Sequence, residues 1–371
     1  MSGAVPEHLA GAVLAIDLAA LKDNYAALAR RARGAECAAA IKGDAYGIGM
    51  ARASRSLWTA GCRTFFVARP REGQELRGFL PDAVIYVLDG LYAGQAAYYI
   101  KHKLRPALVS LEQVREWERD GRKQACALHF DTGINRLGLD AKEAALIADD
   151  KKLPKKLNVT LVMSHLACSD SPAHRMNAVQ LGRFQNIRKL FPAVPASFAN
   201  SSGILLGKSY HFNMVRPGVA LYGGNPAPGK KNPMKAVATL AAKVLQVRHV
   251  QKGDTVGYSA TWKAPRDSRI AILGAGYRDG IPRKLSSSQG SSAAHVWLAG
   301  QRFPIVGRVS MDMMCIDVTA AKRSIKAGMQ AELFGAHIGV DEAANWAGTI
   351  SYELLTHLGN RYARIYSGFE S

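Results

Sequence analysis

Lys42 is the first residue of the chain whose surroundings point to chemistry. It follows a run of small apolar residues at 38–41, and a glycine-rich stretch, GDAYGIG, comes directly after it with Tyr46 inside. An unprotonated lysine amine is a nucleophile that forms Schiff bases with carbonyl compounds. A solvated surface lysine is the ordinary alternative. Polar residues follow several later apolar runs in the same way, namely Asp131, Arg136, His165, Asn200, Ser201, Ser202, Arg216 and Gly218.

The elements that carry these residues alternate between strand-like and helix-like runs. Eight candidate strands lie at 36–42, 63–69, 83–90, 105–110, 125–131, 158–165, 196–200 and 213–223. Segments with apolar residues at helical spacing lie between them, at 51–61, 111–121, 141–152 and 176–191. Short apolar strands that alternate with amphipathic helices indicate a parallel sheet covered on both faces. Eight such units, with no GxGxxG after the first strand, favour a closed (β/α)8 TIM-like barrel over an open doubly wound sheet.

The character of the chain changes after a Pro/Gly/Lys-rich stretch at 225–235. Strand-like runs separated by turn residues follow, at 239–250, 254–262, 269–277, 294–309, 313–319 and 331–335. Helical patterns return only at 340–348 and 351–359. We therefore expect an α/β protein, with a barrel over 12–230 followed by a mostly β C-terminal domain over 231–371. Residues 1–20 are candidates to pack with that second domain.

Residues that follow the strands of a (β/α)8 barrel meet at its C-terminal face, where such proteins bind their ligands. A phosphate is often held there between the loops after strands seven and eight. Ser201 and Ser202 are small donors suited to that task, and Gly218 offers its backbone beside them. Helix capping is the alternative role for the two serines. A phosphate cradle across the mouth from Lys42 indicates pyridoxal 5'-phosphate, bound to the lysine as a Schiff base.

Nine motifs, in order, resemble those of the bacterial alanine racemases, which are fold-type III pyridoxal-phosphate enzymes. The resemblance runs from about residue 12 to residue 366. The motifs are IKGDAYGIG, DTGINRLG, SHLACSD, ANSSG, NMVRPGVALYG, GYSATW, GYRDGIPR, GRVSMDMMCIDV and ISYELLTHLGNRYAR. The resemblance implies a homodimeric enzyme that interconverts L-alanine and D-alanine and supplies D-alanine for peptidoglycan.

The resemblance also implies two proton carriers, one on each face of the substrate's α-carbon. Lys42 is expected to hold the cofactor as an imine and to serve one face. Tyr258, in GYSATW, is expected to serve the other face from the partner subunit. A free tyrosine has a pKa near 10, so Tyr258 needs nearby positive charge or hydrogen bonds to act at neutral pH. On spacing alone, Tyr258 is typical of the core or rim of a β-sheet.

Arg216 is expected to face the pyridine nitrogen of the cofactor. An arginine practically never gives up its proton, so it keeps that nitrogen unprotonated and makes the ring a poorer electron sink. The alternative is an arginine ion-paired across the barrel end. His165 is expected near the ring, with a hydrogen bond to Tyr258. A metal role for His165 is not favoured, because the spacing in SHLACSD matches no zinc arrangement.

The remaining expected contacts rest mainly on the resemblance. The expected cofactor-binding residues are Tyr46, Arg136, Asn200, Ser201, Gly218, Val219 and Tyr352. Arg136 and the backbone N–H of Met311 are expected to hold the substrate carboxylate or the cofactor's phenolic oxygen. Tyr277 is expected to narrow the substrate entrance, and Asp312 to orient its neighbours.

One position departs from the family pattern. Many members carry a lysine two residues before the Asp of DTG, modified to a carbamate that orients the following arginine. This chain has His129 there. A protonated histidine would repel Arg136. We therefore hypothesise that His129 stays neutral and accepts a hydrogen bond, or that a bound anion such as chloride supplies the missing charge.

The composition is that of an ordinary soluble protein with a strongly basic balance. The 371 residues are 48% hydrophobic, and no apolar run reaches the ~20 residues that span a bilayer. The first residues lack a basic n-region, and Asp17 interrupts their apolar stretch, so we expect a cytoplasmic protein without a membrane association. The net charge of +20 is spread along the chain without a nucleic-acid-binding motif. An anionic cofactor and a solvated surface account for it better than nucleic acid.

Three other interpretations of the chemistry stay open. A racemase of broader specificity differs only in its pocket, where one methylene is worth about 1–3 kcal/mol. A barrel-type amino-acid decarboxylase shares the architecture, but its Cys-Asp signature is not evident in VSMDMMC. A pyridoxal-phosphate carrier protein shares the barrel and lacks a full second domain.

Overall fold

The computed structural model describes residues 5–288 and 294–368, which form two compact units. One unit comprises Leu21–Leu221 and Asn225–Met234. The other comprises the residues up to Ala20, Tyr222–Gly224 and the chain from Lys235 on.

The first unit is a parallel barrel, as the sequence predicted. Its strands follow the order β2-β10-β9-β8-β7-β6-β5-β4-β3, and every pair is parallel. The strands are β2 (Glu36–Cys37), β3 (Ala39–Ala40), β4 (Thr64–Val67), β5 (Val84–Val87), β6 (Arg105–Leu108), β7 (Cys126–His129), β8 (Val159–Met163), β9 (Ala196–Ser197) and β10 (Met214–Val215). Only Ala38 separates β2 from β3, so residues 36–40 close the sheet by pairing with β10 on one side and β4 on the other.

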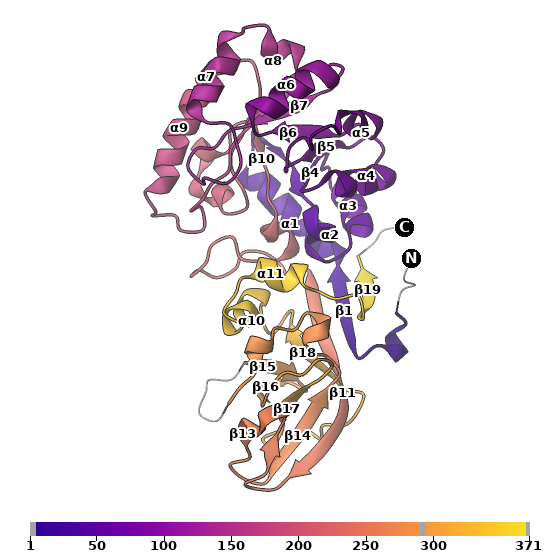
Figure 1. The fold of residues 1–371 in the computed structure, drawn as a ribbon. Coiled ribbons are helices and arrows are strands. Elements are labelled where there is room, and N and C mark those ends of the chain that lie inside the picture. The colour runs from indigo at the N-terminus through magenta and orange to yellow at the C-terminus, as the bar shows by residue number, and fades with distance from the viewer. Residues whose placement is uncertain (1–4, 289–293, 369–371) are drawn as a thin grey trace. The chain divides into compact units, whose positions relative to one another are not determined.

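Helices cover the outside of the barrel strands (Figure 1). They are α1 (Leu18–Arg31), α3 (Met50–Thr59), α4 (Pro70–Phe79), α5 (Ala96–Lys101), α6 (Leu111–Asp120), α7 (Ala141–Asp149), α8 (Leu153–Lys156) and α9 (Met176–Leu190). The start of α7 is set by a capping box, in which Asp140 and Glu143 each accept the other's backbone N–H at 2.8 Å. After β9 and β10 the chain forms short 3-10 turns, η2 (Gly203–Leu206), η3 (Lys208–Tyr210) and η4 (Val219–Tyr222).

The barrel interior is filled with side chains of alternating size. Ala107 and Ala127 leave room for the rings of Phe66 and Tyr86, whose centroids stack 5.1 Å apart. Arg105 lies over the Tyr86 ring and donates to its hydroxyl at 3.2 Å. The interior is therefore a packed core, which confines ligand binding to the ends of the strands.

The second unit is mostly β. Its large sheet has the order β14-β17-β16-β15-β18-β11-β1-β19, and β11 also pairs with β14, so that six of these strands close on themselves. The strands are β1 (Ala12–Asp17), β11 (Ala238–Val250), β14 (Ser268–Leu273), β15 (His295–Leu298), β16 (Gln301–Val306), β17 (Met314–Asp317), β18 (Gln330–Phe334) and β19 (Ala363–Ser367). Two helices, α10 (Val340–Trp346) and α11 (Ser351–Thr356), occupy the positions that the sequence predicted.

Two stretches of this unit differ from the sequence-based expectation. The run 254–262 is not one strand, because β12 (Thr255–Val256) and β13 (Trp262–Lys263) flank a 3-10 turn, η5 (Tyr258–Ala260). Positive φ at Ser259 and Ala260 turns the chain there. Residues 12–17 lie outside the barrel that the range 12–230 predicted and form β1 between β11 and β19 of this sheet, which agrees with the expectation that residues 1–20 pack with the second domain.

Leu14 on β1 tests how strongly this N-terminal strand supports the second unit. Its side chain is fully buried. Leu14→Ala is expected to lower the free energy of unfolding by about 2–5 kcal/mol, because it leaves a cavity in the sheet. The exposed Leu9 gives the control, and Leu9→Ala is expected to change it by less than about 0.5 kcal/mol. Urea unfolding measures both changes in free energy. Equal changes in the two variants would show that the Leu14 side chain does not contribute to the core.

Candidate functional site

The carboxyl ends of the barrel strands bring most of the predicted residues to one rim. Because the strands are parallel, residues that follow them lie at the same end of the barrel. Lys42 follows β3, His129 ends β7 and His165 follows β8. Asn200 and Ser201 follow β9, and Arg216, Gly218 and Val219 follow β10.

The backbone after Lys42 turns with the left-handed sense. Gly43, Asp44 and Ala45 have φ of 64°, 53° and 55°, and Tyr46 has φ of 52°. Only glycine adopts this conformation freely, and other residues pay roughly 1–2 kcal/mol each. A run of such residues persists only where surrounding contacts hold it, which is typical of functional sites.

Glu72 near the start of α4 supplies one of these contacts. Its Oε1 accepts the backbone N–H of Gly43 at 2.7 Å, and its Oε2 accepts the backbone N–H groups of Ala68 at 2.8 Å and Arg69 at 3.0 Å. The Asp44 carboxylate accepts the backbone N–H of Met50 at 2.7 Å. Sequence reasoning missed Glu72, whose only signal is its place in the first turn after Pro70.

Lys42 lies partly buried beside this turn. Burial and the nearby Arg136 lower the pKa of its amine, whereas Asp89 and Glu72 oppose that shift. A lowered pKa increases the fraction of neutral amine, which is the nucleophilic form.

Arg216 is buried inside the barrel mouth. Its Nη1 donates to the Ser197 hydroxyl at 2.5 Å, its Nη2 donates to the Ser164 carbonyl at 2.6 Å, and the guanidinium lies 5.6 Å from the centroid of the Phe66 ring. Within residues 5–288 and 294–368, no carboxylate forms an ion pair with it. Burial lowers its pKa to about 9, which still leaves it charged at neutral pH. The ion-paired arginine considered as an alternative is therefore not what the structure shows.

Two histidines lie within the positive field of this arginine. Burial, followed by Arg216, Arg136 and other cationic neighbours, lowers the pKa of His165 well below its ordinary value. Burial and the same two arginines lower the pKa of His129 from 6.5 to about 3. Both imidazoles are neutral at neutral pH.

His129 agrees with one half of the hypothesis made for it. It is neutral, but neither ring nitrogen has a hydrogen-bond partner among the described residues. The expectation that it accepts a hydrogen bond from its surroundings is therefore wrong for this structure. A buried imidazole without partners is uncommon, because an unsatisfied polar group costs about 1–3 kcal/mol.

The loops after β9 and β10 form a cradle of small groups. The Ser201 hydroxyl oxygen accepts the backbone N–H of Gly218 at 2.9 Å and that of Ala220 at 3.3 Å. Asn200 Oδ1 accepts the backbone N–H of Gly203 at 2.9 Å. A Cβ at Gly218 would lie 2.3 Å from the Tyr46 hydroxyl oxygen, so glycine lets the loop after β10 approach the segment after β3 that carries Tyr46.

The second unit carries its own group of predicted residues. Tyr258 is 71% exposed at the turn η5, and Tyr277, Met311 and Tyr352 are also exposed. Asp312 forms an ion pair with Arg361, whose Nη1 lies 2.7 Å from Asp312 Oδ1.

Metal and membrane sites receive no support from the described part of the chain. It holds no cluster of three or more His, Cys, Asp or Glu side chains that could bind a metal ion. It also contains no helix with both the length and the apolar character needed to cross a membrane.

The closed parallel barrel, the lysine at its rim and the β unit define an α/β-barrel protein with an appended β domain. Residues 16–226 match the family model of the alanine racemase N-terminal domain, and residues 237–366 match that of the alanine racemase C-terminal domain. The chain belongs to the alanine racemase family.

Individual relatives resemble the chain over nearly their whole length. It is 47% identical over 361 residues to the alanine racemase of Methylobacterium nodulans, covering 96% of each chain. It is 45% identical to that of Rhizobium meliloti, covering 98% of this chain and 99% of the relative. The alanine racemase of Bartonella henselae, solved with covalently bound pyridoxal phosphate, matches with a TM-score of 0.91 and 36% identity over 96% of this chain and 99% of its own. The biosynthetic enzyme of Pseudomonas aeruginosa matches with a TM-score of 0.89 and 32% identity, at the same coverage.

Gly218→Ala tests the close approach of the loop after β10 to Tyr46. Gly218→Ala is expected to lower the free energy of unfolding by about 1–3 kcal/mol, because the new methyl group overlaps Tyr46. The matched control is Gly182→Ala on α9, where an added Cβ meets nothing within 4 Å. That change is expected to stabilise the protein by about 0.5–1 kcal/mol, because it removes a helical glycine. Urea unfolding gives both values, and a neutral Gly218→Ala would contradict the packing.

His129 predicts a loss of stability in acid. The unfolded chain takes up a proton at this residue below its ordinary pKa of 6.5, whereas the folded state does so only near 3. Stability is therefore complete above pH 6.5 and falls as the pH drops toward 3, by up to about 1.4 kcal/mol per pH unit. His129→Gln cannot titrate, so its urea midpoint is expected to fall less steeply between about pH 6 and pH 4. Parallel pH profiles for the two proteins would show that His129 is not buried as a neutral group.

Proposed function

We propose that this protein is a pyridoxal-phosphate-dependent alanine racemase that interconverts L-alanine and D-alanine. The observation that carries the proposal is the barrel rim, where a lysine of lowered pKa shares a buried, positively charged mouth with Arg216. Membership of the alanine racemase family supports it. So does the similarity to the Bartonella henselae enzyme with its covalently bound pyridoxal phosphate.

The residues present fit an anionic cofactor. Arg216 brings a buried positive charge that no carboxylate of the described residues neutralises. The loops at Ser201 and Gly218 form a cradle that a single Cβ would fill. Small donors and glycine backbone are the groups that proteins use to hold phosphate. The expected phosphate and cofactor contacts are Tyr46, Arg136, His165, Asn200, Ser201, Arg216, Gly218, Val219 and Tyr352.

Pyridoxal phosphate, when bound, supplies an electron sink that makes the α-proton of an amino acid acidic. Lys42 would hold the cofactor and move a proton at one face of the α-carbon. Tyr258 of the partner subunit would move a proton at the opposite face. Two carriers are needed because a single group would tend to return the proton to the face from which it came. The turn at residues 43–46 would fix the backbone position of Lys42.

Arg216 would limit what else the site can do. Its guanidinium stays a donor at neutral pH, so it would keep the ring nitrogen of the cofactor unprotonated. The electron sink is then weaker, which disfavours side reactions such as transamination. A barrel-type decarboxylase would more usually place a carboxylate at this position. The arginine is thus the observation that favours a racemase over that alternative.

The substrate would be held mainly by its carboxylate. Arg136 and the backbone N–H of Met311 are the proposed contacts, with Tyr277 at the entrance and Asp312 orienting its neighbours. His165 is neutral and lies close to the mouth. It would form a hydrogen bond with the hydroxyl of Tyr258 of the partner subunit. If Tyr277 narrows the entrance as proposed, it would favour a small side chain such as that of alanine.

The active enzyme is proposed to be a cytoplasmic homodimer. The barrel unit would bind the cofactor, and the mostly β unit would contribute to the partner subunit's active site. The high exposure of Tyr258 supports this arrangement, because a catalytic tyrosine in open solvent has no substrate to act on. The D-alanine formed would supply peptidoglycan. The relatives from Agrobacterium fabrum and Pseudomonas aeruginosa are named biosynthetic.

The decisive experiment supplies L-alanine and pyridoxal phosphate to the purified protein and follows optical rotation. Rotation is expected to decay to zero without release of carbon dioxide. Lys42→Ala is expected to abolish the decay. Tyr258→Phe is expected to slow it about 10²–10⁴-fold, the usual worth of a general acid–base group, while the cofactor's absorbance is retained.

Tyr98→Phe is the matched control, because it removes a tyrosine hydroxyl on the barrel exterior, and it is expected to leave the rate unchanged. Unchanged rotation with the wild-type protein would contradict the proposed function. A repeat with serine, lysine and arginine would then identify a racemase of different specificity. Full turnover by Tyr258→Phe would contradict the two-base assignment alone.

A further inference from the structure

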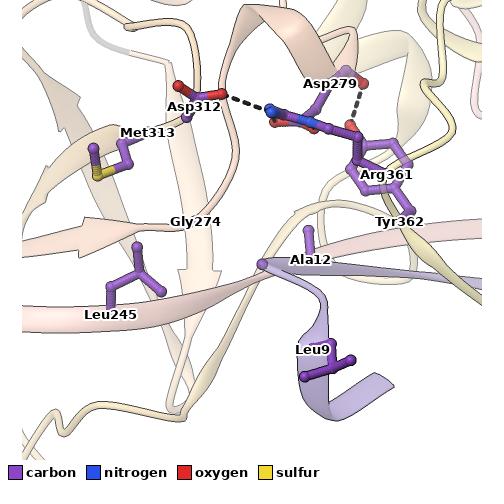
Figure 2. A pocket seen from close by; sticks show the side chains of 10 residues that line it. Leu9, Ala12, Leu245, Gly274, Asp279, Asp312, Met313, Arg361 and Tyr362 are labelled. Atoms are coloured by element: carbon purple, nitrogen blue, oxygen red, sulfur yellow. Dashed lines mark hydrogen bonds and ion pairs between the residues drawn. The ribbon is translucent and has the colours of Figure 1, made fainter. Parts of the chain in front are cut away.

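One arginine of the second unit joins the two loops that carry Tyr277 and Met311. Arg361 lies just before β19, and its guanidinium is the centre of the cluster in Figure 2. Its Nε and Nη2 donate to the two carboxylate oxygens of Asp279 at 2.7 and 2.8 Å, and its Nη1 donates to Asp312 Oδ1 at 2.7 Å. Both carboxylates raise the pKa of Arg361, so the charge is permanent. A planar guanidinium can bridge two carboxylates in this way, whereas an ammonium group cannot pair bidentately.

Asp279 is the fixed end of this bridge. Its side chain is buried, and its Oδ2 also accepts the backbone N–H of Gly276 at 2.9 Å. Its backbone carbonyl accepts the hydroxyl of Tyr362 and the backbone N–H of Gly359. The turn η6 (Tyr277–Asp279) therefore cannot shift without breaking several hydrogen bonds at once.

The loop 310–313 meets this turn through the backbone. Tyr277 N–H donates to the Ser310 carbonyl at 2.9 Å, and Arg278 N–H donates to the Met311 carbonyl at 3.0 Å. A Cβ at Gly276 would lie 2.3 Å from the Ser310 carbonyl oxygen and 2.4 Å from that of Met311. A displacement of one loop is therefore felt by the other.

Asp312 is the more exposed end of the bridge, because its loop borders a hollow. The side chain is half exposed, and a hollow of about 420 Å³ lies beside it. Leu9, Leu245 and Met313 line this hollow together with the ion pair, as Figure 2 shows. On the side of the hollow, the pair between Arg361 and Asp312 ties the loop to the residue that also holds Asp279.

We propose that Arg361 is a positioning residue that sets the place of the Met311 backbone N–H and of the Tyr277 ring. It does so by holding the carboxylates of Asp312 and Asp279 at a fixed separation. The ligand bound by the groups so positioned is a small amino acid, held by its carboxylate. The inference rests on the proposed function, since Met311 and Tyr277 contact substrate only there. Arg361 itself touches neither substrate nor cofactor in this scheme.

Arg361→Met tests the bridge, because it keeps most of the side-chain volume and removes the charge. KM for L-alanine is expected to rise at least about tenfold, while kcat changes less than about threefold, because substrate binding is weakened more than the chemistry. Hydrogen exchange of the cofactor-free protein gives an independent reading. Backbone amides of 276–279 and 310–313 are expected to exchange at least about tenfold faster, the effect of about one lost charge-assisted hydrogen bond.

Two further variants separate positioning from a general loss of stability. Arg302→Met is the matched control, because it removes a bidentate pair with Glu342, at 2.6 and 3.0 Å, in the same unit. It is expected to leave KM and the exchange of both loops unchanged. Asp312→Asn frees only the exposed end, so exchange is expected to rise most in 310–313, with a smaller rise at the amides of Tyr277 and Arg278, which donate to that loop. Asp312→Asn also tests the bridge if Arg361→Met fails to fold.

Unchanged KM and unchanged loop exchange in Arg361→Met or Asp312→Asn would overturn the proposal. Uniformly faster exchange across the unit in both variants would overturn it as well, because the bridge would then be only a stabilising contact. If the wild-type protein does not racemise alanine, the proposed function fails. The exchange data, which need no substrate, still decide whether Arg361 sets the two loops.

Discussion

The guanidinium of Arg216 is the interaction on which the barrel mouth depends. Burying a charge costs several kcal/mol unless nearby groups compensate. Here the compensation comes from the Ser197 hydroxyl, the Ser164 carbonyl and the face of Phe66, all of them neutral. Burial lowers the pKa of His165, and the field of the arginine, which no carboxylate of the described residues cancels, lowers it further. The mouth therefore keeps its histidines neutral and retains a positive potential for an anionic ligand.

The backbone beside Lys42 also adopts a conformation that is unfavourable by itself and is held by its surroundings. Its left-handed turn is unfavourable for residues other than glycine, and the carboxylate of Glu72 helps to hold it from another element. In the cradle, a Cβ at Gly218 would overlap the Tyr46 hydroxyl. Strained backbone, a buried charge and close loop contacts are thus concentrated at one rim, where they fix the geometry of a site at the expense of stability.

Two arginines of the chain do opposite work. Arg216 lacks a carboxylate among the described residues, its pKa is lowered, and its unpaired charge is available to a ligand. Arg361 is paired with two carboxylates that raise its pKa. These carboxylates lie in two loops and compensate its charge. Arg216 contributes positive electrostatic potential at the barrel mouth, and Arg361 fixes the positions of two loops. The difference follows from their neighbours, since the two side chains are chemically identical.

Much of this protein could be predicted from its sequence. The alternation of apolar strands and amphipathic helices predicted the parallel barrel, and the polar residues after the strands predicted which of them share a rim. These inferences succeed because periodicity and strand direction are local properties of the chain. The left-handed sense of the turn at 43–46 and the role of Glu72 were not predictable in this way. Nor were the isolation of His129 and the bridge made by Arg361. Each of these depends on hydrogen bonds, burial or charge from residues far away in the sequence, and only the tertiary structure brings such residues into contact.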